Sequence, residues 1–173
     1  MKKLVLLMIV LLASIARADA QSAPSEPTAA ETVEWLRGKL ATASRDHYTV
    51  KVTEHQLVIE TYRSERLWTD SDGAGYVSTW DVQTVSFGSI KSINPDARCT
   101  QYSACSILFY GDFSDCQVEH GAQEQLNDPT CTRVQSIKFE IYQNDWANAG
   151  RFIKAFKRLA ELDGAQFTNS NLY

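Results

Sequence analysis

The sequence lacks the short motifs by which many enzymes and metal proteins are recognised. It contains no H-E-x-x-H zinc motif, no G-x-S-x-G nucleophile elbow and no C-x-x-C pair, and it has only three histidines. A long apolar run is also missing, because Leu4 to Ile15 is interrupted by Ser14 and a membrane span needs about 20 residues. These absences argue against a zinc protease, an α/β-hydrolase, a cysteine-ligated metal site and stable membrane insertion.

The first twenty residues have the organisation of a secretory signal peptide. Lys2 and Lys3 precede the apolar run, and Ala18-Asp19-Ala20 places small residues around a cleavage site. We therefore predict that residues 1–20 are removed and that the mature protein begins at Gln21. The predicted location is periplasmic or secreted.

The mature chain is acidic. The full sequence has a net charge of −4, and its leader, with three basic residues against Asp19, contributes +2, which leaves −6 on residues 21–173. Such a surface repels nucleic acid and anionic lipid, so neither is expected as a partner. The length suits one domain with one hydrophobic core. We predict a mobile lead-in over residues 21–27, a domain over 28–164 and a polar tail over 165–173.

Four cysteines follow the leader: Cys99, Cys105, Cys116 and Cys131. An even number in an exported chain predicts two disulfides with three possible pairings, whereas no Cys/His cluster has the spacing of a zinc site. We favour Cys99 with Cys105 and Cys116 with Cys131, because each bond closes a local loop. The second bond would stabilise the fold by about 3 kcal/mol in the chain-entropy model.

An amphipathic helix is predicted near the start of the domain. Thr28 and Glu31 have the spacing of a capping box, in which each side chain bonds a free backbone donor of the other residue. The helix is expected to end near Ser44, and its apolar stripe at helical spacing consists of Val33, Leu36 and Leu40.

A second amphipathic helix is predicted near the C-terminus. Asn144 or Asp145 can cap its start, and Gly164 can adopt the left-handed conformation that ends it. Its apolar stripe recurs at spacings of three and four and consists of Phe152, Ile153, Phe156, Leu159, Ala160 and Leu162.

The residues between these helices predict strands and turns. Alternating or apolar runs indicate strands over residues 48–53, 57–61, 76–85, 85–93, 105–110 and 134–141. We expect a kink at Gly88 and a long irregular segment from Gly111 to Cys131, held by a disulfide. Short connections favour antiparallel pairing. The predicted fold is α+β: an N-terminal helix, a six- to seven-stranded bent antiparallel sheet or partial barrel, and a C-terminal amphipathic helix packed on it.

This element order, together with the final strand and helix from Ile137 to Leu162, resembles a pleckstrin-homology-like domain over residues 46–163. It is also similar to exported bacterial proteins in which a helix with Trp and Leu precedes such a sheet. Members of the family that bind phosphoinositides carry basic residues in the first hairpin turn, whereas this turn is Glu54-His55-Gln56. The family's Trp lies well inside the last helix, whereas Trp146 falls in the first turn. The resemblance therefore implies the fold and disfavours lipid-headgroup binding.

Three acid–histidine neighbours are the candidate catalytic groups: Asp46-His47, Glu54-His55 and Glu119-His120. A histidine beside a carboxylate can serve acid–base catalysis or metal binding. Adjacent residues of a strand point to opposite faces, however, so we favour solvated histidines and assign no catalytic residue.

A calcium site is the alternative for the stretch from Asp70 to Asp81. Positions one, three, six, nine and twelve of a calcium loop would be Asp70, Asp72, Gly75, Ser78 and Asp81. Position five is an alanine and the flanks resemble strands, so a hairpin turn rich in Asp and Gly is the favoured interpretation.

The predicted second helix carries a basic set, Arg151, Lys154, Lys157 and Arg158. These residues could form a contact patch for an anion, although such charges on an amphipathic helix usually form a solvated face, and those in its last turn would complement the helix dipole. The four tryptophans are interpreted as packing residues rather than a ligand platform.

The sequence thus favours an exported, non-enzymatic binding domain without a cofactor. Its partner is expected to be a protein or small molecule of the cell envelope. A small periplasmic hydrolase using acid–histidine residues and a calcium-stabilised structural module are the alternatives.

Overall fold

A computed structural model describes residues 26–40, 48–70, 73–95, 105–121, 127–141 and 149–168. Several of the predicted features lie outside these residues: the signal peptide, His47, Asp72, Cys99 and the helix caps Asn144 and Asp145. In the described part of the chain no helix is both long enough and apolar enough to cross a membrane.

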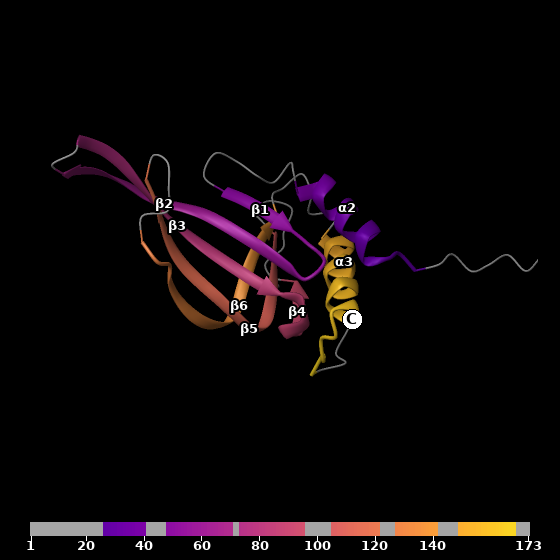
Figure 1. Cartoon of the computed structure of the whole chain (residues 1–173). Helices are drawn as coiled ribbons and strands as arrows, with labels where there is room; N and C mark the ends of the chain where they lie inside the picture. The colour runs from indigo at the N-terminus through magenta and orange to yellow at the C-terminus, as the bar shows by residue number, and fades with distance from the viewer. Residues whose placement is uncertain are drawn as a thin grey trace, which may run out of the picture.

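The described residues form a curled six-stranded antiparallel sheet, a half-barrel, with two helices packed on its inner side (Figure 1). The helices are α2 (Ala29–Leu40) and α3 (Ala149–Leu162). The strands are β1 (Tyr48–Val52), β2 (Gln56–Asp70), β3 (Gly73–Ser86), β4 (Ile90–Pro95), β5 (Cys105–His120) and β6 (Thr130–Ile141). The predicted α+β fold is confirmed.

Strands β3 and β4 together behave as one bent strand. A 3₁₀ turn, Phe87–Ser89, separates them, and both pair with β5, while β6 pairs with the other edge of β5. The predicted kink at Gly88 is therefore a full corner.

Gly88 is required at this corner because a Cβ atom would lie 2.9 Å from the backbone oxygen of Asp163. On β5, a Cβ at Gly111 would collide with Ser89 O and lie 2.6 Å from the Phe113 ring.

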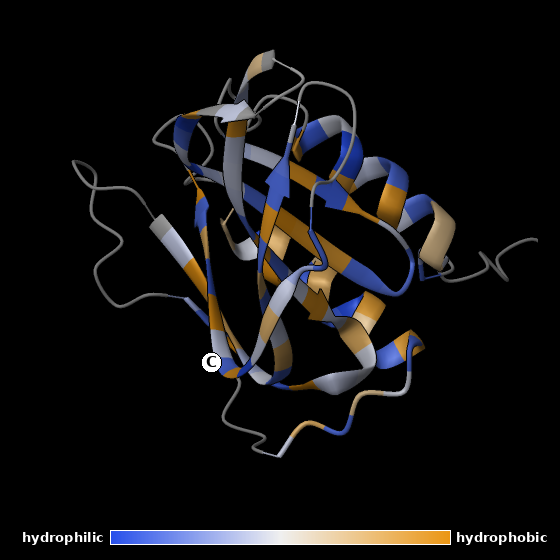
Figure 2. Ribbon diagram, turned by 60° about the vertical axis from the view of Figure 1, so that its left-hand side comes forward, coloured by the Kyte–Doolittle hydropathy of each residue, from blue (hydrophilic) through white to orange (hydrophobic). Residues whose placement is uncertain are grey.

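The inner face of the sheet next to the helices forms the hydrophobic core. Phe156 of α3 is fully buried, and its ring lies 5.2 Å from that of Phe109, 5.9 Å from Phe139 and 6.2 Å from Phe87, measured between centroids. In Figure 2 apolar and polar positions alternate along the strands that lie beside the two helices. Aromatic rings of this kind contribute much of a core's stability, so α3 is the element that closes the half-barrel.

The same inner face becomes polar beyond the helices. Gln83 donates to Asp115 at 3.0 Å, and Arg63 lies 3.2 Å from Asp81. β2 and β3 then continue past β1 and β5 as a two-stranded extension, residues 64–70 and 73–77, which we call the β2–β3 arm (Figure 1). Leu67 and Tyr76 are cross-strand partners on this arm, and each is 62% exposed.

The prediction of an irregular segment from Gly111 to Cys131 is wrong for the first half of that segment. Residues 111–120 continue β5, which pairs with β3 and β6. The error has a physical cause: a strand is recognised by an apolar side facing a core, and Asp115 and Gln117 face the polar part of the sheet instead. The chain leaves β5 only after His120 and enters β6 at Thr130.

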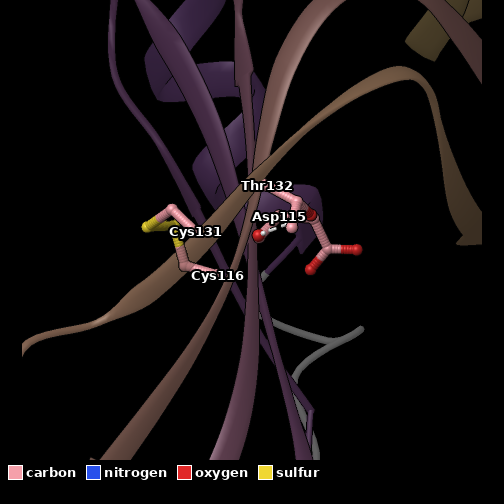
Figure 3. Close-up of a disulfide and its surroundings, with 4 residues drawn as sticks. All are labelled: Asp115, Cys116, Cys131 and Thr132. Carbon is pink, nitrogen blue, oxygen red and sulfur yellow. Dashed lines mark hydrogen bonds between the residues drawn. A yellow bond between two sulfur atoms is a disulfide. The ribbon is translucent and has the colours of Figure 1, made fainter.

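Cys116 and Cys131 form the predicted disulfide, with their Cα atoms 4.0 Å apart. The two residues are in direct register on β5 and β6, so the bond ties neighbouring strands rather than the ends of an irregular loop. Figure 3 shows it beside the hydrogen bond from Thr132 Oγ1 to Asp115 O, which measures 3.4 Å. A disulfide is typical of oxidising compartments outside the cytoplasm. The predicted partner bond, Cys99 with Cys105, involves a residue outside the described part.

Both predicted helix signals that lie in described residues are confirmed. Thr28 N donates to Glu31 Oε2 at 2.8 Å and Glu31 N donates to Thr28 Oγ1 at 3.3 Å, which completes the capping box. These bonds from Thr28 lower the pKa of Glu31. At the end of α3, Gly164 has φ of 85°, and Ala165 N donates to Ala160 O at 2.8 Å, as in a Schellman motif.

The first residues after α3 are not a loose tail. Ala165 and Phe167 pack against the core, and Thr168 N donates to Lys91 O at 3.1 Å. At the other end of the domain, Glu26 and Pro27 contact Arg158 of α3. The compact domain thus extends two residues further at its start and at least four further at its end than the predicted range of 28–164.

Candidate ligand groove between the two helices

Helices α2 and α3 run antiparallel beside each other. The start of α2 lies by the later part of α3, since Arg158 Nε donates to Pro27 O at 3.3 Å. The middle of α2 lies by the start of α3, where the Trp35 and Phe152 rings are 5.5 Å apart. Between these two contacts the helices leave a recess of about 380 Å³ that opens to solvent. We call it the α2–α3 groove.

The floor of the α2–α3 groove is mostly apolar. Trp35 and Ala155 are half-buried against the core, and Thr32 is buried with its hydroxyl donated to Thr28 O at 2.8 Å. The Thr32 hydroxyl thus has its partner within the helix. The floor therefore offers an indole and methyl groups for apolar contact.

The rim of the α2–α3 groove is mainly basic. Arg151 and Lys154 are exposed on the α3 side, and Arg158 stands further along the same side. Glu31 is the acidic residue among those that line the groove, and its carboxylate accepts hydrogen bonds from the backbone N and the hydroxyl of Thr28. Arg158 is engaged too, because its Nη1 lies 2.8 Å from Glu26 Oε2.

The predicted basic set is divided by the fold. Arg151, Lys154 and Arg158 come together at the α2–α3 groove, whereas Lys157 Nζ lies 5.7 Å from the centroid of the Phe167 ring. The suggestion that basic residues of this set complement the helix dipole in the last turn is wrong, because the last turn of α3 contains no basic residue. Helix stability through the dipole therefore does not explain these charges.

His55 has a carboxylate partner, but not the predicted neighbour Glu54. Its Nδ1 lies 2.6 Å from Asp163 Oδ1, and the other oxygen of Asp163 accepts a bond from Gly88 N at 2.8 Å. This hydrogen bond and the negative charge of Asp163 raise the pKa of His55. The His55 side chain is 76% exposed. The arrangement joins the β1–β2 turn, the 3₁₀ corner and the end of α3, which is a structural role.

The described acid–histidine residues do not converge. Gln56 pairs with Ser86 and His120 with Ser78, so His55 and His120 lie near opposite ends of β3, roughly 26 Å apart at 3.3 Å per residue. Glu119 contacts Arg66 at 3.3 Å and accepts a bond from Asn127 at 2.9 Å. By strand alternation, His120 lies on the opposite face from Glu119.

Asp70 and Asp81 are likewise not brought together. Asp70 pairs with Gly73 at the tip of the hairpin, whereas Asp81 lies eight residues further along β3, roughly 26 Å away in an extended strand. Asp81 contacts Arg63 instead. Among the described residues, no group of three or more His, Cys, Asp or Glu side chains is placed to hold a metal ion.

A second recess, of about 310 Å³, lies on the outer face of the sheet beside Trp80 and His120. Trp80 is occupied by its neighbours, since its ring packs edge-on against Tyr62 at 5.6 Å and its Nε1 donates to Ser78 at 3.1 Å. Lys51 and Glu60, which also line this recess, are paired with each other at 2.7 Å. Trp80, Lys51 and Glu60 are therefore already engaged, whereas Arg151 and Lys154 make no ion pair with any described residue.

Sequence reasoning missed two parts of these sites. Glu26 and Pro27 were assigned to a mobile lead-in, yet they engage Arg158 at the end of the α2–α3 groove. Trp35 was interpreted as packing alone, although it also forms the groove floor. In the sequence, the one sign of this second role is that Trp35 lies beside the apolar stripe of its helix and not within it.

No family model, no curated protein and no solved structure matches this chain.

Proposed function

We propose that the mature chain is an exported, non-enzymatic binding domain and that the α2–α3 groove is its ligand site. The observation that supports this proposal is an apolar floor between two helices anchored to one core, with basic groups of α3 at its rim. Ligand sites are typically concave and mainly apolar, with a few polar groups that orient the ligand. The α2–α3 groove has this composition, and its volume lies in the range of small-molecule sites.

The distribution of the described histidines supports binding over catalysis. His55 serves to join three structural elements, and it lies at the far end of β3 from His120. General acid–base catalysis needs its groups within hydrogen-bond reach of one substrate. These two histidines do not meet that requirement together.

Native mass spectrometry of the protein recovered from the exported fraction would test this function. We expect a co-purifying small molecule on the wild type and on Ala30→Phe, a control at an exposed position of α2 away from the groove lining. We expect its loss from Ala155→Phe, which fills the groove floor. A ligand that stays on Ala155→Phe, or a wild type recovered repeatedly without any ligand, would contradict the assignment of the groove.

Export itself has a direct test. We expect the intact mass of the protein from the exported fraction to correspond to a chain that begins at Gln21 with its cysteines oxidised. A cytoplasmic protein that retains Met1 to Ala20 would refute export.

We also propose that the fold is pleckstrin-homology-like. The antiparallel meander followed by a C-terminal helix that closes it supports this proposal. An experimental structure whose strands and final helix could not be superimposed on such a domain in the same order would overturn it.

A further inference from the structure

We propose that the α2–α3 groove takes a small amphipathic anion, with its apolar ring system on Trp35 and its carboxylate or sulfonate held by Arg151 and Lys154. This inference rests on the function proposed above and adds the chemical class of the ligand.

Two of the charged side chains that line the groove, Glu31 and Arg158, already have partners within the protein. The Glu31 carboxylate accepts hydrogen bonds from Thr28 N and Thr28 Oγ1, and Arg158 contacts Glu26 and the Pro27 carbonyl. Arg151 and Lys154 make no ion pair within the described ranges. An anion placed between these two residues would therefore meet unengaged cations. In a chain with a net charge of −4, this is a local departure from the overall charge.

The spacing of the basic residues on α3 lowers the stability of the helix, and a bound anion would offset this loss. Arg151 and Lys154 are three residues apart on α3, and Arg158 follows four residues later, so like charges lie next to one another on one side of the helix. Like charges at these spacings destabilise a helix. A bound anion would relieve this repulsion, and the same spacing allows Arg151 and Lys154 to approach one anionic group.

The shape of the α2–α3 groove favours a small molecule over a protein segment. At one end, Arg158 is held by Glu26 and by Pro27 O, and at the other end Trp35 packs on Phe152. These contacts limit the groove to about two turns of each helix. A volume of about 380 Å³ suits one compact ligand, and the indole of Trp35 favours a ring over a flexible chain.

The test compares two dyes with the same aromatic body and different charge. The anionic dye is 1-anilinonaphthalene-8-sulfonate, and the uncharged dye is N-phenyl-1-naphthylamine. Binding of each to the oxidised mature protein is followed by fluorescence titration, and competition between the dyes establishes that they share one site. We expect 1:1 binding of both dyes and loss of both in Ala155→Phe.

The charge variants then isolate the role of the basic rim. In Arg151→Gln/Lys154→Gln we expect the Kd of the sulfonate dye to rise roughly tenfold, with little change for the uncharged dye. The control, Lys138→Gln/Lys157→Gln, removes the same charge elsewhere and should leave both affinities close to wild type. Equal unfolding midpoints of the two variants confirm that folding is not the cause.

Three outcomes would overturn the inference. If both dyes bind and the rim variant does not weaken the sulfonate dye, the anion preference is wrong while the groove remains a ligand site. If neither dye binds, or Ala155→Phe binds both unchanged, the proposed site fails as well. If a Glu-rich peptide binds through Arg151 and Lys154 and the dyes do not, the groove serves a protein partner instead.

Discussion

The inner face of this sheet has two regions that share the same strands but differ in what covers them. Near the helices, β3 and β5 carry Val85 and Phe113, which are buried in the core. Further along the same strands, Gln83 and Asp115 form a hydrogen bond where no apolar core is built. The β2–β3 arm lies beyond that polar region. The inward-facing residues of β3 and β5 are thus apolar where α2 and α3 pack on the sheet and polar further along the same strands.

This comparison also bears on function. The α2–α3 groove lies on the rigid region, where its residues are positioned by helices packed on the core. Binding sites built on such elements hold their geometry better than sites on projecting segments. The β2–β3 arm exposes Leu67 and Tyr76 on two paired strands, while Val77 beside them is buried and Arg66 contacts Glu119 of β5.

The largest predicted effect contrasts the two regions directly. Phe156→Ala should lower the free energy of unfolding by about 3–5 kcal/mol, because it leaves a cavity among several buried rings. Tyr76→Ala, also an aromatic truncation but on the arm, should change it by less than about 0.5 kcal/mol. Urea denaturation measures both. Similar losses for the two variants would show that the arm is part of the core, against the comparison.

The second prediction concerns the disulfide in the region away from the helices. Cys116→Ser/Cys131→Ser should lower the free energy of unfolding by about 3 kcal/mol in the chain-entropy model, for a sequence separation of 15. The measurement is denaturant unfolding under oxidising conditions, with wild type in a reducing agent as a second reference. An unchanged unfolding midpoint would mean that β5 and β6 stay associated in the unfolded chain or that the bond is absent.

The helix ends and the core strands could be predicted from the sequence because their signals are local. The capping box at Thr28, the Schellman end at Gly164 and the apolar alternation of β1 all depend on neighbours within a few residues. The second half of β5 could not be predicted, because its inward residues are polar and neither α2 nor α3 packs on them.

The candidate site was predicted only in part. The basic residues of α3 were recognised as a possible anion contact, but the α2–α3 groove needs Pro27 to Trp35 beside Arg151 to Arg158. That juxtaposition depends on how both helices pack on one core, which no local pattern reveals. The partner of His55 is likewise remote in sequence, 108 residues away at Asp163.

The third prediction is a helix-capping effect of about 1 kcal/mol. Thr28→Ala removes the hydroxyl of the capping box and should destabilise the protein by about that amount. Ala30→Ser, at an exposed position in the same turn, is the control and should have a smaller effect. Thermal or urea unfolding distinguishes them. A neutral Thr28→Ala would indicate that the Pro27–Arg158 contact alone holds the start of α2.

The smallest predicted effect is a pH dependence at His55. Asp163 raises the pKa of His55 in the folded protein above its ordinary value of 6.5. The stabilisation is therefore fully present below about pH 6.5, the pKa of the unfolded chain, and is lost as the pH rises through the raised folded-state pKa. His55→Gln should be less stable than wild type at about pH 5.5 and equal to it at about pH 9.

An NMR titration of His55 gives the matching site-specific test. Asp163→Asn keeps an acceptor for Gly88 N but removes the charge, so the pKa of His55 should fall towards its ordinary value. A pKa that stays raised in Asp163→Asn would assign the shift to another group, such as Glu54.

The central claim is that recognition occurs at the helix-covered region, in the α2–α3 groove. Amide chemical-shift mapping of the mature protein during titration with 1-anilinonaphthalene-8-sulfonate tests it most directly. We predict that the perturbed amides cluster in residues 27–35 and 151–158, with the β2–β3 arm unchanged. Perturbations centred on residues 64–77 would contradict the account and move the binding surface to the arm.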